Sequence, residues 1–129
     1  MKGIYTLLIF VSKNINIKIG SLGIIRFKKG IYAYVGSAQN NLEKRIRRHK
    51  LKNKIKFWHI DYLLVNNFSK IKKVFYKKAN KTEECRIAKK LNKNEIPIPN
   101  FGCSDCNCKS HLFKIKNLDS VLKLNMVEL

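Results

Sequence analysis

The chain has 129 residues, which is enough for one compact domain with a hydrophobic core but leaves little room for a second. Hydrophobic residues make up 45% of the chain, and this composition excludes a largely disordered protein. The 28 Lys and Arg residues face only eight Asp and Glu, and the resulting net charge of +20 favours an anionic partner, above all nucleic acid.

The N-terminal run 3–11 is apolar, follows a single lysine and has no small-residue cleavage site after it. It predicts a first strand rather than a signal peptide. No apolar stretch approaches the ~20 residues that a membrane helix needs. We therefore expect a soluble, cytoplasmic protein without a membrane partner. An A+T-rich genome would also enrich lysine, but it would not explain why carboxylates are scarce.

The predicted elements alternate between strands and helices. The β-rich runs 15–19, 24–28 and 31–36 follow the first strand and are separated by Asn, Gly and Lys, which predicts antiparallel hairpins. A helix is expected over 42–51 after Asn40 and Asn41, a short helix in 58–64, and a strand over 69–77. Thr82 is expected to cap a second long helix that reaches about Leu91. A late strand in 111–116 and a short helix from about Asp119 complete the chain.

Strands with helices packed against them imply a small α/β or α+β fold, with a central antiparallel sheet, an inserted hairpin and flanking helices. We expect a single domain over 1–129, made of a core over 1–92 and a Cys/His-rich C-terminal extension over 93–129.

Two side chains of the first long helix are candidates for binding or catalysis. Helical projection places Arg45 and His49 one turn apart, at the edge of the apolar stripe formed by Leu42 and Ile46. The outward face goes to Glu43, Lys44, Arg47 and Arg48. At a cleft, the guanidinium can bind phosphate and the imidazole can move a proton. The alternative is a snorkelling surface arginine and a buried histidine with a satisfied partner.

The second long helix places Glu84 near the centre of its apolar stripe, with Ile87, Ala88 and Leu91, and Glu83 towards the outer edge. A carboxylate on a buried face is costly unless it is paired or bound to metal. Glu84 is therefore a candidate ligand for a divalent cation, and a salt bridge to a Lys or Arg is the alternative.

The cysteines form a separate group. Cys103, Cys106, Cys108 and His111 have the spacing C-x2-C-x-C-x2-H, and Cys85 could replace one of them. Such soft ligands are typical of a tetrahedral structural zinc site, which would hold the tail against the second long helix. A disulfide and simple packed thiols remain alternatives. For His59 and Asp61 we predict packing and capping only.

Four features together resemble the GIY-YIG nuclease superfamily: Gly3-Ile4-Tyr5 opening a strand, Tyr34-Val35-Gly36 closing a later one, Leu42 with Arg45 and His49 on a helix, and Glu84 on a further helix. The resemblance covers about residues 1–92. The segments WHIDYLL and FGCSDCNCKSHLF are similar to a small, mostly archaeal branch of that superfamily.

The resemblance implies a role for each matching residue. Tyr5 and Tyr34 would lie side by side in the cleft, where one of them deprotonates or orients the attacking water. Nearby cations and the metal would stabilise its phenolate. Gly36 would let the backbone pass close to the substrate. Arg45 would neutralise the scissile phosphate, His49 would assist proton transfer or phosphate binding, and Glu84 would hold one Mg²⁺ or Mn²⁺.

The chain departs from the family pattern in three places. The segment between Tyr5 and Tyr34 is longer than is typical, which we interpret as an inserted hairpin around Gly20–Gly23. A second Gly30-Ile31-Tyr32 lies too close to Tyr34 to form the partner strand. Ser37 stands where excision-repair members carry a lysine, so the group that activates the phenol is left open.

We thus expect a metal-dependent endonuclease that acts on DNA, with RNA as the other candidate polymer and with no small-molecule cofactor. The alternatives are a non-catalytic nucleic-acid-binding module of the same fold and a zinc-stapled RNA-binding protein. The sequence leaves the oligomeric state and the substrate structure open.

Overall fold

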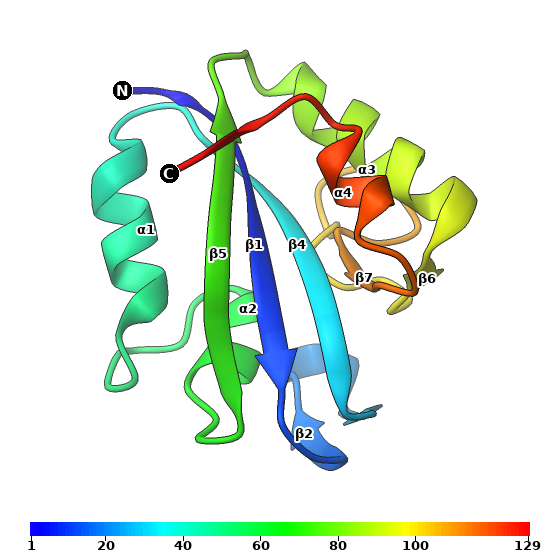
Figure 1. Ribbon diagram of the computed structural model, residues 1–129. Helices are drawn as coiled ribbons and strands as arrows, with labels where there is room; N and C mark the ends of the chain where they lie inside the picture. Colours follow the sequence, from blue (N-terminus) through cyan, green and yellow to red (C-terminus); the bar gives the residue numbers. More distant parts are fainter.

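A six-stranded antiparallel sheet forms the centre of the computed structural model, which describes residues 1–129 (Figure 1). The strand order is β6-β7-β4-β1-β5-β8. The strands are β1 (Gly3–Val11), β4 (Gly30–Ala38), β5 (Ser69–Lys77), β6 (Ile96–Pro97), β7 (Leu112–Lys114) and β8 (Val127–Glu128). Between β1 and β4 the chain forms a separate hairpin of β2 (Ile15–Lys18) and β3 (Ile24–Phe27), joined through a 3-10 turn at Gly20–Leu22.

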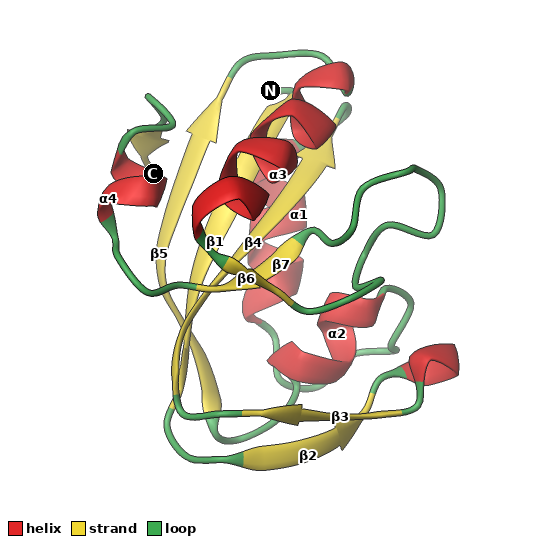
Figure 2. Ribbon diagram, turned by 90° about the vertical axis from the view of Figure 1, so that its right-hand side faces the viewer, coloured by secondary structure: helices red, strands yellow, loops and turns green.

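Helices cover both faces of the sheet. The helices α1 (Leu42–Lys50) and α2 (His59–Leu64) lie on one face, and α3 (Thr82–Asn94) and α4 (Asp119–Leu122) lie on the other (Figure 2). None of these helices has the length and hydrophobicity that a membrane crossing requires.

Strand β1 is buried on both faces, which explains why it is a continuous apolar run rather than an alternating one. Tyr5, Leu7 and Ile9 point into the hydrophobic cluster beneath α1 and α2. Ile4 and Leu8 point into the cluster beneath α3 and α4. The alternation of strand side chains thus gives one central strand to two separate cores.

The expected fold class and most elements are confirmed. The strands over 3–11 and 69–77 have the predicted bounds, and the inserted hairpin is present. The predicted cap was wrong, because Thr82 is the first helical residue and the preceding Lys81 makes no side-chain cap. Instead, Asn80 accepts a hydrogen bond from the Thr82 amide at 3.2 Å. The segment 93–129 contributes β6 and β7 to one edge of the sheet and β8 to the other.

A buried carboxylate joins α1 to α2. The Asp61 side chain is fully buried and accepts two hydrogen bonds of 2.9 Å from Arg48. It also accepts from the backbone amides of Phe57 and Trp58, which confirms the predicted capping by Asp61. Arg48 was predicted to face outward, but it turns inward because Asp61 gives it a bidentate partner.

We expect Asp61→Asn to lower the free energy of unfolding by about 3 kcal/mol, because it leaves the Arg48 guanidinium and two amides without their charged acceptor. Urea unfolding measures this. The matched control is Asp105→Asn, since Asp105 forms an exposed ion pair with Lys81 and its loss should cost less than ~1 kcal/mol. Equal losses in the two variants would contradict the assignment of Asp61 as the anchor.

Candidate active site

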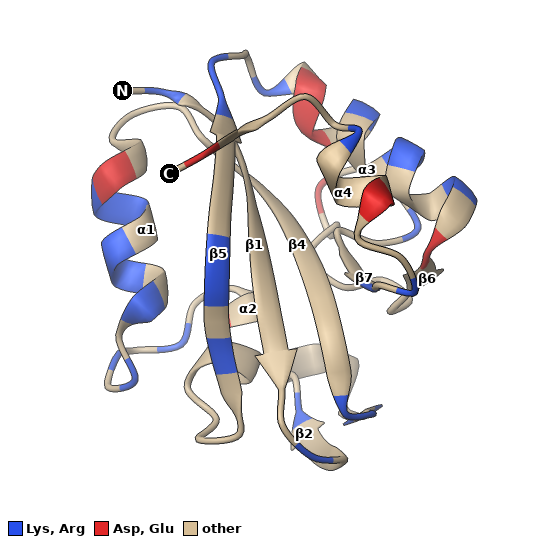
Figure 3. Cartoon of the chain, viewed as in Figure 1, with Lys and Arg blue, Asp and Glu red and all other residues tan.

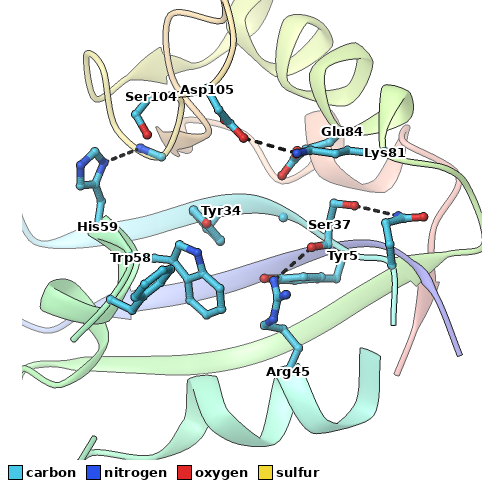
Figure 4. A pocket seen from close by; sticks show the side chains of 14 residues that line it. Tyr5, Tyr34, Ser37, Arg45, Trp58, His59, Lys81, Glu84, Ser104 and Asp105 are labelled. Atoms are coloured by element: carbon cyan, nitrogen blue, oxygen red, sulfur yellow. Dashed lines mark hydrogen bonds and ion pairs between the residues drawn. The ribbon is translucent and has the colours of Figure 1, made fainter. Parts of the chain in front are cut away.

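A cleft of about 620 Å³ opens beside the C-terminal part of β4, and Figure 4 shows the side chains that line it. Strands β1 and β4, helix α1, the segment before α2, the start of α3 and the loop 101–111 all contribute to its walls. The lining residues are Tyr5, Tyr34, Gly36, Ser37, Gln39, Arg45, Phe57, Trp58, His59, Lys81, Glu84, Gly102, Ser104 and Asp105. The cleft thus brings together five of the six predicted site residues, and His49 lies directly behind it.

Gly36 is required by its neighbour on β1. The β1–β4 register pairs Tyr5 with Gly36, and a Cβ atom at Gly36 would lie 2.4 Å from Cζ of Tyr5. The Tyr5 ring therefore lies directly against the Gly36 backbone. Gly36 also lines the cleft, so the close approach of its backbone to a substrate stays a prediction, and the structure adds that the Tyr5 ring fills the place of a side chain.

Tyr5, Tyr34 and His49 form a buried aromatic group. The ring centroids of Tyr5 and Tyr34 are 6.4 Å apart, and Tyr5 Oη lies 2.7 Å from Nε2 of His49. Burial raises the pKa of Tyr5 to about 12, against an opposing effect of Arg45, and raises that of Tyr34 well above its usual value. Both phenols are therefore neutral near pH 7, although cationic side chains are abundant in this chain.

His49 is neutral as well. Its side chain is buried, and burial together with the nearby charge of Lys54 lowers its pKa to about 3. Its other ring nitrogen, Nδ1, has no hydrogen-bond partner. In the tautomer that leaves Nε2 unprotonated, Tyr5 donates its hydroxyl proton to His49. The sequence left open which group assists the phenol. In the structure the hydrogen-bond partner of Tyr5 is His49, one helical turn after Arg45.

Arg45 is held by two contacts. Its Nη1 donates to the carbonyl oxygen of Ser37 at 3.0 Å, and its guanidinium carbon lies 4.4 Å from the centroid of the Trp58 ring. These contacts fix the planar group at the cleft wall and leave further N–H donors for an anion. The backbone amide of Trp58 donates to the Asp61 carboxylate at 2.9 Å, so the buried carboxylate also supports this wall.

Glu84 extends from the first turn of α3 toward the cleft, with 14% of its side chain exposed. Burial raises the pKa of Glu84 to about 7. Of the nearby charges, Lys81 lowers this pKa and Asp105 raises it, and both effects are smaller than that of burial. Its one ion-pair contact is with Nδ1 of His111, at 3.6 Å. The predicted alternative, a salt bridge to Lys or Arg, instead describes Glu83, which pairs with Lys77 and Arg86.

A second group of potential ligands lies behind Glu84. The ligand atoms of Cys85, Cys106, Cys108 and His111 lie within 4.8 Å of one another, close enough to hold a metal ion. Cys103 lies outside this group, although its spacing to Cys106 had made it a candidate. Its thiol is buried, and its carbonyl oxygen accepts the Cys106 amide at 3.3 Å. Cys85 takes the place that the sequence had offered to Cys103.

Sequence reasoning missed several residues of the cleft. Trp58 and His59 fall in the predicted short helix, where only packing and capping were expected of His59, and Asp105 falls in a segment for which no element was predicted. His59 accepts a hydrogen bond from the Gly102 amide at 2.9 Å, which ties the start of α2 to the loop 101–111. The dense WHIDYLL segment was the available signal, but its partners lie far away in the sequence.

Comparison with known proteins gives a family and no function. The family described as "Domain of unknown function DUF123" has a model that matches residues 4–127, so the match spans the cleft and the Cys/His group. No curated protein and no solved structure matches the chain.

The buried His49 predicts a pH-dependent stability. Its folded pKa of about 3 lies below the ordinary value of 6.5, so its contribution is complete above pH 6.5 and is lost as the pH falls toward 3. We expect this group to lower the free energy of unfolding by up to ~1.4 kcal/mol per pH unit in that window. Urea unfolding of the wild type and of His49→Gln should converge as the pH falls. Parallel stability curves would contradict a buried neutral histidine.

Proposed function

The chain belongs to the DUF123 family, and we propose that it is a metal-dependent endonuclease of the GIY-YIG type that hydrolyses phosphodiester bonds in DNA. One observation carries this proposal. Two phenols, a guanidinium and a carboxylate without a Lys or Arg partner converge on one cleft. The motif residues that resemble the superfamily are therefore neighbours in space as well as in order.

The surroundings of Glu84 fit a divalent cation. Its carboxylate is largely buried, faces the cleft and makes no salt bridge to a Lys or Arg, so it would bind Mg²⁺ or Mn²⁺ through oxygen. Glu84 would supply the one protein ligand, and water and substrate oxygens would have to supply the others. When bound, the cation neutralises charge that develops on the phosphate.

Tyr5 and His49 would move the proton of the attacking water. A phenol with a pKa near 12 does not supply a preformed phenolate at pH 7. Tyr5 would therefore accept the proton of the water at the same time as it gives up its own hydroxyl proton. The water oxygen bonds to phosphorus, the water proton passes to Tyr5 Oη, and the Tyr5 proton passes to His49 Nε2. The bond from phosphorus to the leaving oxygen breaks, and solvent protonates that oxygen. Burial disfavours the imidazolium of His49, so its extra proton returns through Tyr5 to solvent and both groups are neutral again.

Arg45 and Tyr34 would orient the reactants. Arg45, held against Trp58 and Ser37, presents its remaining donors to the scissile phosphate and stabilises its added charge. The Tyr34 hydroxyl lies in the cleft wall beside Tyr5 and can position the water for in-line attack.

A basic surface would guide the polymer to the cleft. Lys44, Arg47 and Arg48 line a second hollow along α1 that shares Arg45 with the cleft. Lys and Arg also dominate α1 and the middle of β5 (Figure 3). Phosphates would bind to these side chains along α1 next to Arg45, and Glu43 in the first turn is the one acidic residue of this helix.

The test compares two neighbouring carboxylates. Supercoiled, branched and flapped DNA are incubated with the protein and Mg²⁺ or Mn²⁺, and then with EDTA. We expect metal-dependent nicking that falls at least ~100-fold in Glu84→Gln, because the cation loses its protein ligand. Glu83→Gln is the matched control, since Glu83 pairs with Lys77 and Arg86 away from the cleft, and its rate should be unchanged.

Binding and cleavage separate the remaining outcomes. Glu84→Gln should still bind DNA with the salt dependence of the wild type. Tight binding without cleavage by the wild type would support a non-catalytic module instead. Cleavage that survives in Glu84→Gln would contradict the assignment of this residue.

A further inference from the structure

We infer that Cys85, Cys106, Cys108 and Nε2 of His111 bind one zinc ion, and that this ion fixes a wall of the cleft and orients Glu84. The site is separate from the Mg²⁺ or Mn²⁺ ligand of the proposed nuclease. Its three sulfurs and one nitrogen are the soft donor set that zinc prefers.

The spacing of the ligand atoms fits a tetrahedral ion. Zinc bonds of about 2.3 Å to sulfur and ~2.0–2.1 Å to nitrogen, at a tetrahedral angle, separate sulfur from nitrogen by about 3.6 Å. Nε2 of His111 lies 3.6 Å from Sγ of Cys106 and 3.9 Å from Sγ of Cys85. The four groups come from α3 and from the loop 101–111, so folding assembles the site from distant parts of the chain.

The composition of the cluster favours a metal over a disulfide. Three thiols meet one imidazole, so a single disulfide would leave an unpaired thiol and a buried imidazole without a role. Cys103 supplies an internal comparison, because its sulfur lies outside the cluster. It contributes a backbone carbonyl to the turn, and a side-chain substitution leaves that carbonyl in place.

His111 connects the zinc site to Glu84. Its side chain is buried, and Nδ1 has no hydrogen-bond partner, but it faces Oε2 of Glu84 at 3.6 Å. With Nε2 bound to the ion, Nδ1 must carry the ring proton and donate it toward the carboxylate. One carboxylate oxygen is thereby oriented, and the other is left for the cleft. His111 is thus a zinc ligand and a positioning residue for Glu84.

The same ion would hold the cleft wall. Gly102, Ser104 and Asp105 line the cleft, and they lie in the loop that carries Cys106, Cys108 and His111. This loop contains almost no regular secondary structure, and its tie to the opposite wall is the 2.9 Å hydrogen bond from Gly102 to His59. A metal bond to Cys85 gives the loop a covalent-strength link to α3, directly beside Glu84.

Elemental analysis of the purified full-length protein tests the site. We expect one zinc per chain in the wild type and in Cys103→Ser, and loss of zinc in Cys108→Ser and His111→Asn. Cobalt(II) exchanged into the wild type should give the visible absorption of a tetrahedral thiolate complex. The cobalt(II) spectrum is measured on the wild type, so it tests the site even where a substitution of a zinc ligand impairs folding.

Two further measurements separate the zinc site from the nuclease. Glu84→Gln should keep its zinc, so a failed cleavage assay leaves this inference standing. Removing zinc should speed hydrogen exchange in the segment 101–111 and at the start of α3, with β1 and β4 unchanged. Wild-type protein without zinc, an oxidised pair among the three thiols, or equal zinc loss in Cys103→Ser and Cys108→Ser would overturn the inference.

Discussion

The contact between the Tyr5 ring and the Gly36 backbone is the constraint on which the cleft depends. The antiparallel register of β1 and β4 sets these two residues opposite each other, and no side chain larger than hydrogen fits between them. This contact directs the Tyr5 hydroxyl to Nε2 of His49. Tyr34 lies on β4 two residues before Gly36, and its side chain therefore points to the same face of the sheet as that of Tyr5. A shift of the β1–β4 register by one residue would place the two phenols on opposite faces of the sheet, so that they no longer met in one cleft.

Burial then decides what chemistry the cleft can support. The hydrophobic cluster beneath α1 holds Tyr5 and His49 as neutral partners, because desolvation disfavours both the phenolate and the imidazolium. In the hydrolysis that we propose, this neutral donor and neutral acceptor, 2.7 Å apart, would exchange a proton without a charged resting state. The same burial leaves Glu84 costly as a free anion, so a bound cation is the natural way to stabilise it.

Much of the fold and most of the cleft follow from local patterns in the sequence. The helical period of 3.6 residues placed Arg45 and His49 on one edge of a helix. The same period put Glu84 on the buried face and its neighbour Glu83 on the outer edge. The partners of Arg48 and Gly36 could not be predicted this way, since Asp61 and Tyr5 meet them only through tertiary contacts. Cysteine spacing was misleading for the same reason: Cys103 is near in sequence, but Cys85 is near in space.

The C-terminal segment belongs to the cleft as much as the motif-bearing strands do. Strand β7 and His111 before it bond to β4 as far as Val35, and the rest of the loop turns away to form the opposite wall through Gly102, Ser104 and Asp105. Phe101 anchors one end of this loop in the hydrophobic core, but the residues at the cleft, Gly102, Ser104 and Asp105, bury no apolar side chain of their own. The sulfur and imidazole groups that it carries therefore have a clear physical role, because they can fasten a polar wall that a hydrophobic core could not.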